Sequence, residues 1–133
     1  MKPLWIPIAL LGAVLAFSLF SGARIADAAR AWDELLAQSQ QEAAAGNWDA
    51  ARETLETCHQ RWLQDQFWLR VTAHHQGLDS AEELFRRAAA LAGDESCTDF
   101  MAETEALRSQ IRTMAETEQL RLGNVFTCLP AAC

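Results

Sequence analysis

The chain begins with a long apolar segment. No residue from 3 to 23 is ionisable, and residues 4–20 are almost wholly apolar. A helix rises about 1.5 Å per residue, so about 20 such residues cross the hydrocarbon layer of a bilayer. The pattern therefore predicts a transmembrane signal anchor over residues 1–23, which crosses the membrane through residues 4–20.

A cleaved secretory signal is the alternative for this segment. Lys2 supplies a basic start, and residues 21–23 (Ser-Gly-Ala) or 26–28 (Ala-Asp-Ala) offer small side chains at a cleavage site. The apolar region of such a signal usually covers about 7–15 residues. The segment here is longer, which favours the anchor.

Helical periodicity follows over residues 24–126. This region contains no proline and is dominated by alanine, leucine, glutamate, glutamine and arginine, which favour helices. Residues 24–45 predict a first helix that can run straight on from the membrane segment. Gly46 and Asn47 end it, and Asn47 is suited to cap the next helix. The apolar stripe of the first helix consists of Ile25, Ala28, Ala29, Trp32, Leu35 and Leu36.

The second helix, which starts at Trp48, carries apolar residues on two faces. Its core face consists of Trp48, Ala51, Leu55, Cys58, Trp62 and Leu69. Phe67, Trp68 and Val71 lie away from that face. Either the helix touches two neighbours and buries both faces, or Phe67, Trp68 and Val71 form a face for a partner.

A break in the helix is expected around residues 74–79, where the chain either turns or only kinks. Gly77 can adopt the left-handed conformation that follows a helix end, and Ser80 with Glu83 has the spacing of a capping box. Ser96 with Asp99 has the same spacing. The third helix places Leu78, Ala81, Phe85, Ala88 and Ala92 on one face, and the fourth places Phe100, Leu107, Ile111 and Met114 inward.

Helices with such short connections are typical of an antiparallel bundle. The sequence therefore predicts an all-α fold, with one N-terminal transmembrane helix followed by an antiparallel bundle of three to four helices. The bundle domain covers residues 24–126, and residues 127–133 form a cysteine-containing tail.

The charge of the chain limits its partners. Its 18 acidic residues against 11 lysines and arginines give a formal net charge of −7, and Lys2 is the only lysine. Nucleic acids attract clustered lysine and arginine, so we expect no nucleic-acid partner. Basic residues flank the apolar segment on both sides, but its place at the start of the chain favours an N-terminus in the cytoplasm. We therefore expect a single-pass protein of the cell membrane with an extracytoplasmic domain.

Four cysteines are disulfide candidates: Cys58, Cys97, Cys128 and Cys133. Three full pairings are possible and remain open. Cys58 lies on the core face, as a buried apolar residue or as one half of a disulfide, while Cys128 and Cys133 are close enough in the tail to pair with each other. Stable disulfides belong to oxidising compartments, which is compatible with export.

The histidines offer the alternative chemistry. The alternative function is a small metal- or ligand-binding domain or a metal-dependent enzyme that uses His59, His74, His75 and nearby carboxylates. His75 and Asp79, four residues apart, are the metal candidates, but the expected turn at Gly77 separates them. The sequence contains no HExxH motif, no GxSxG motif and no phosphate-binding glycine loop. We therefore expect no enzyme and no cofactor.

Several short motifs together resemble a known family. They are Gly46-Asn47-Trp48-Asp49-Ala50-Ala51, Trp62 and Trp68, then His75-Gln76-Gly77-Leu78-Asp79 with Leu84, and finally Leu122-Gly123-Asn124-Val125-Phe126. In order and spacing they are similar to an uncharacterised family of short Gram-positive bacterial proteins, domain of unknown function number four-three-six-three, over about residues 4–126. That family commonly has an acidic residue where Gly77 stands, and Cys128 and Cys133 lie beyond its usual end. The resemblance implies an N-terminal membrane segment, a helical domain and association with another membrane protein.

The sequence thus predicts a membrane-anchored extracytoplasmic interaction or accessory module. Its expected partner is another membrane protein or a second copy of the chain, and Phe67, Trp68 and Val71 are the candidate partner face. The alternative is the metal or ligand site at His59, His74 and His75.

Overall fold

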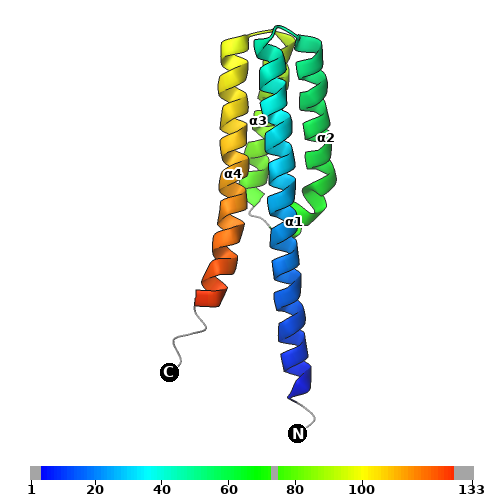
Figure 1. Ribbon diagram of the computed structural model, residues 1–133, viewed down its shortest axis with the longest axis vertical. Coiled ribbons are helices and arrows are strands. Elements are labelled where there is room, and N and C mark those ends of the chain that lie inside the picture. The colour runs from blue at the N-terminus through cyan, green and yellow to red at the C-terminus, as the bar shows by residue number, and fades with distance from the viewer. Residues whose placement is uncertain (1–3, 73–74, 128–133) are drawn as a thin grey trace.

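The computed structural model describes residues 4–72 and 75–127, and the side chains of residues 4–71 and 76–120. Within these residues four helices and no strand are present: α1 (Trp5–Ala44), α2 (Trp48–Thr72), α3 (His75–Gly93) and α4 (Cys97–Thr127). They run alternately up and down as an antiparallel bundle (Figure 1). The predicted all-α fold is confirmed.

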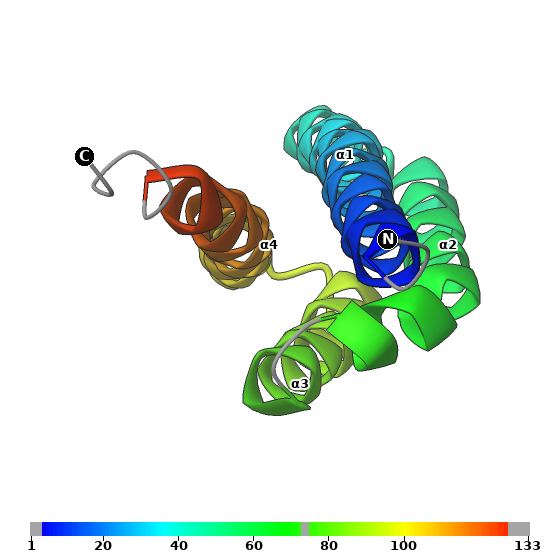
Figure 2. The same cartoon turned by 90° about the horizontal axis from the view of Figure 1, so that it is seen from below.

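The helices form a closed ring of neighbours. α1 packs against α2 and α4, and α3 packs against the same two helices from the opposite corner (Figure 2). Short connections at Ala45–Asn47 and Asp94–Ser96 join the pairs at one end of the bundle (Figure 1). The apolar half of α1 extends from the other end.

α1 is one continuous helix of 40 residues. Its N-terminal half is long and apolar enough to cross a membrane, and its large apolar side chains are exposed. From Ser21 onward the same helix buries one face in the bundle. The prediction that the first bundle helix continues from the apolar segment is confirmed, and packing begins within the segment that the sequence assigns to the anchor.

The core consists of the stripes predicted from the sequence. Trp62 is fully buried at its centre, with its ring centroid 4.9 Å from that of Trp32 and 5.8 Å from that of Phe85. Trp48 packs edge-on against Phe100 nearer the connections, with 5.6 Å between centroids. The buried apolar residues are Ile25, Ala29, Trp32, Leu36, Ala43, Ala51, Leu55, Cys58, Trp62, Leu69, Leu78, Ala81, Phe85, Ala88, Ala92, Phe100, Leu107 and Ile111.

Local sequence explains both described connections. Gly46 has a φ of 79°, a conformation that costs other residues steric strain, and its N–H bonds to the carbonyl of Ala43. The side chain of Asn47 then accepts a hydrogen bond from the Ala50 N–H, 3.4 Å away, so the predicted cap is confirmed. At the second connection the Ser96 hydroxyl donates to the Asp99 carboxylate at 2.8 Å.

The predicted break between the second and third helices is confirmed, but the helix-ending role predicted for Gly77 is wrong. α2 ends at Thr72 and α3 begins at His75, so Gly77 lies within the first turn of α3 and has no positive φ. Ser80 does not cap a helix, because its hydroxyl donates to the Gln76 carbonyl one turn earlier. Gly77 instead faces α4, where an added Cβ would lie 3.5 Å from the Met114 side chain.

Candidate functional site at the junction of the apolar segment and the bundle

Exposed apolar side chains of the bundle gather at one end. Among the described residues after Phe20, the exposed large apolar side chains are Leu63, Phe67, Trp68, Val71 and Leu120. All five belong to the C-terminal halves of α2 and α4. These halves lie at the end of the bundle from which the apolar half of α1 extends (Figure 1). The opposite end has none among its described side chains. Among the described residues of the bundle, exposed large apolar side chains are therefore confined to the end beside the apolar segment.

The candidate partner face lies at this end. Phe67 is 71% exposed and Val71 is 61% exposed, so contact with two neighbouring helices does not bury them. Leu63, Phe67 and Val71 are spaced four residues apart and form one stripe on the outside of α2. Of the two interpretations left by the sequence, burial between neighbours is wrong for Phe67 and Val71.

Trp68 joins the end of α2 to the apolar segment. Its ring lies 6.1 Å from the ring of Phe17 on α1 and 6.1 Å from that of Phe67. Phe17 falls within the segment predicted to cross a membrane. The end of α2 thus lies beside apolar helix, at the level where α1 leaves the bundle.

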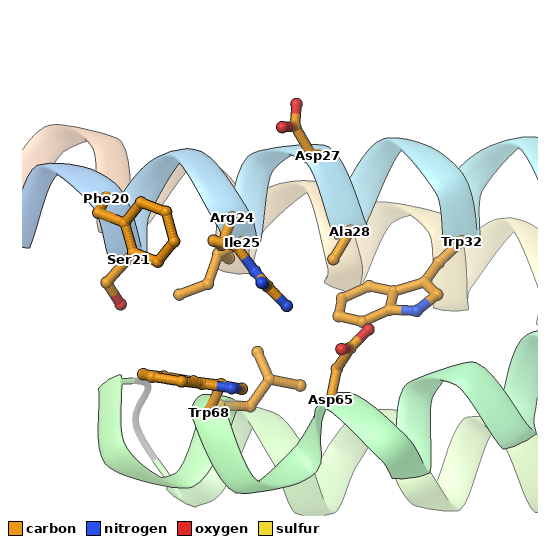
Figure 3. A pocket seen from close by; sticks show the side chains of 10 residues that line it. Phe20, Ser21, Arg24, Ile25, Asp27, Ala28, Trp32, Asp65 and Trp68 are labelled. Carbon is orange, nitrogen blue, oxygen red and sulfur yellow. The ribbon is translucent and has the colours of Figure 1, made fainter.

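A cavity of about 260 Å³ lies between α1 and α2 at the same level. Figure 3 shows Arg24 reaching from α1 and Asp65 from α2 into this space, while Asp27 points away. Trp68 forms its floor near Phe20, and Trp32 closes the end toward the core. The cavity therefore combines apolar walls with one cation and one carboxylate.

A polar network that the sequence did not predict joins α1 to α4. Arg108 donates to both carboxylate oxygens of Asp33, at 2.8 and 3.0 Å, and to the Gln40 side chain at 3.1 Å. The Gln40 amide donates in turn to the buried hydroxyl of Thr104. Through its hydrogen bonds, Arg108 holds the pKa of the Asp33 carboxyl below its ordinary value. Two spacings in the sequence could have indicated this network. Asp33 and Gln40 are seven residues apart and Thr104 and Arg108 are four residues apart, so each pair lies on one face of its helix.

A groove of about 300 Å³ follows this network along α1 and α4 toward the apolar segment. Its small and apolar members are Ala26, Ala29, Ile111 and Ala115, and its polar members are Arg30, Asp33, Glu34, Arg112, Glu116 and Gln119. Small side chains allow a helix to approach closely. The groove thus offers a close-packing surface with charges of both signs around it.

The predicted metal ligands are brought together only in part. His59 and Glu82 share a hydrogen bond of 3.1 Å between α2 and α3, and the His59 ring stacks on Phe85. Asp79 is exposed on α3, one turn beyond His75 on the same helix. The side chain of His75 and the whole of His74 lie outside the described residues. The described side chains include no group of three or more potential metal ligands.

The described cysteines are free thiols. Cys58 is buried, and its thiol donates to the Trp32 carbonyl at 3.6 Å. Burial raises the pKa of Cys58 to about 12, so this thiol is unreactive. Cys97 is exposed at the start of α4, whereas Cys128 and Cys133 lie outside the described residues. Of the two roles expected for Cys58, a buried apolar residue is confirmed.

One family model matches the chain over residues 19–125, and it describes a Domain of unknown function (DUF4363). The chain belongs to this family. The match confirms the resemblance seen in the sequence, and in this DUF4363 protein it runs from the end of the apolar segment through nearly all of the bundle. No curated protein and no solved structure matches the chain.

Proposed function

We propose that this DUF4363 protein is a single-pass, membrane-anchored interaction module whose bundle stands outside the cytoplasm and associates with another membrane protein. The main observation in support is that the exposed apolar half of α1 and the exposed large apolar side chains of the bundle lie at the same end of the molecule.

Energetics support the anchor. Ten exposed side chains of residues 4–20 are Leu, Ile, Val or Phe. Each contributes about 0.3–0.6 kcal/mol to insertion at the centre of a membrane helix, which amounts to about 3–6 kcal/mol. No ionisable residue lies between positions 3 and 23, so no charge opposes this free energy of insertion.

The α1–α4 groove supports the association. It starts at Ala26, directly after the apolar segment, so a partner that emerges from the same membrane reaches it without a long linker. Ala26, Ala29 and Ala115 admit close approach of a helix, and the surrounding charges of both signs can pair with polar residues at its edges. We therefore expect the occupant to be a helix of a membrane protein adjacent to its transmembrane segment.

Photo-crosslinking in native membranes tests the association. A photoreactive amino acid at Ala115 lies in the groove, and the same residue at Ala90, exposed on α3, is the matched control. We expect one reproducible adduct from position 115 and none from position 90. Only monomer at both positions, or the same adducts from both, would contradict the association.

Alkaline extraction of the same membranes tests the anchor separately. An anchored chain stays in the pellet with integral proteins. Release into the supernatant, together with an N-terminus that begins after residue 23, would contradict the anchor and support a cleaved signal.

A further inference from the structure

The length of the exposed part of α1 limits how far the bundle can lie from the membrane that α1 is proposed to cross. From Trp5 to Phe17, whose ring packs against that of Trp68 on α2, the helix rises about 18 Å. The hydrocarbon layer of a bilayer is about 30 Å thick. If residues 4–20 cross it, as the sequence predicts, the level of Phe17 lies about 4.5 Å below the end of the apolar run at Phe20. Trp68, which contacts Phe17, then lies at the boundary between the hydrocarbon layer and the membrane interface.

The side chains at the end of α2 suit that depth. Phe67 and Val71 are mostly exposed and point away from the bundle, and Trp68 has the amphipathic ring that favours membrane–water interfaces. In water, by contrast, Phe67 and Val71 would leave an apolar patch uncovered.

We propose that the end of α2, centred on Phe67, Trp68 and Val71, is a lipid-contacting surface that sits in the membrane interface beside residues 17–23 of α1. This inference rests on the membrane anchoring proposed above. The occupant is lipid because the surface is continuous with apolar helix at the same level. Attachment is apolar rather than electrostatic, since the chain carries a net charge of −7 and its only lysine is Lys2.

Fluorescence quenching by nitroxide-labelled lipids tests the contact on the full chain. Cys97, Cys128 and Cys133 are replaced by serine, and Cys58 stays because it is buried. An environment-sensitive dye is then attached at Phe67→Cys or, in a second variant, at Val71→Cys. The matched control is Glu53→Cys, exposed on the same helix and about 21 Å from Phe67. Vesicles contain phosphatidylcholine and phosphatidylglycerol in equal parts.

We expect shallow nitroxides to remove most of the emission at positions 67 and 71 and to leave position 53 unchanged. Omitting phosphatidylglycerol or adding salt leaves this result unchanged, because no electrostatic attraction is involved. A dye at Leu10→Cys reports the anchor, and deep nitroxides quench it if α1 crosses the membrane.

The outcomes separate the two proposals. Quenching at position 10 without quenching at 67 and 71 overturns the lipid contact and leaves the anchor standing. Blue-shifted emission at 67 that lipids do not quench also overturns it, because a protein partner or a second copy then covers the surface. Loss of quenching at all three positions overturns the anchor and the lipid contact together.

Discussion

The ion pair between Asp33 and Arg108 provides the sharpest test of how α1 and α4 are held together. The two residues are 75 positions apart in sequence, and their side chains are only 28% and 18% exposed. Substituting Asp33→Asn keeps the shape, removes the charge and leaves one oxygen to accept from Arg108. Hydrogen bonds to charged groups contribute about 1.5–3 kcal/mol each, and partial exposure screens them. We therefore expect a loss of about 2 kcal/mol in the free energy of unfolding at pH 7.

The effect depends on pH with a defined sign. The folded-state pKa of Asp33 is lowered, chiefly by the hydrogen bond from Arg108. Ionised Asp33 therefore stabilises the fold above its unfolded pKa of about 3.9, and this contribution disappears as the pH falls through the folded pKa. The difference in the free energy of unfolding between wild type and Asp33→Asn therefore has its whole value at pH 7 and becomes smaller below about pH 4.

Urea unfolding of the full chain in mild detergent, followed by tryptophan fluorescence, measures this difference. Asp27→Asn is the matched control, since Asp27 pairs with Arg30 on the same helix but both side chains are 76% exposed. We expect it to change stability by less than about 0.5 kcal/mol. Equal effects of the two substitutions at pH 7, or an Asp33→Asn effect that persists undiminished at low pH, would refute the reasoning.

Three further predictions follow from the core, the cysteines and the first connection. Trp62→Ala empties the centre of the core and lowers stability by about 3–5 kcal/mol, seen as a lower melting temperature by circular dichroism. In a variant whose Cys128 and Cys133 are replaced by serine, a membrane-impermeant maleimide labels Cys97 on intact cells without prior reduction. Cys58 reacts with the maleimide only after the protein is denatured. Labelling of Cys97 only after the cells are lysed would place the bundle in the cytoplasm. Gly46→Ala costs about 1 kcal/mol because of the positive φ, although no atom lies within 4 Å of the added methyl group. Gly93→Ala, equally open and without a positive φ, is neutral or stabilising in the same thermal assay.

The helices and their buried faces were predictable because each is a local pattern. Trp62, Phe85 and Phe100 recur with their apolar neighbours at helical spacing, and burial of one face follows from that spacing alone. Gly77 shows the limit of local rules. A glycine near a helix end resembles a terminating residue, yet here α2 has already ended at Thr72 and Gly77 belongs to the next helix.

The sequence predicted which residues belong to the candidate site, but not where they lie in the fold. The sequence singled out Phe67, Trp68 and Val71 as an apolar face, but their position beside Phe17 depends on how α2 is aligned with α1. The pairing of Asp33 with Arg108 depends in the same way on the alignment of α1 with α4. Such alignments arise from the packing of the whole core, which the periodicity of a single helix does not contain.

The continuity of α1 has a mechanical consequence. Because one helix forms both the apolar segment and a side of the bundle, no hinge separates them, and the bundle must follow every change in the orientation of the segment. From Ala23 to Ala44 the helix rises about 31 Å, so a tilt of about 20°, which is ordinary for a membrane helix, moves the far end by about 11 Å. If the segment crosses a bilayer, as proposed above, a small tilt of the segment becomes a large displacement of the connections at Gly46 and Glu95.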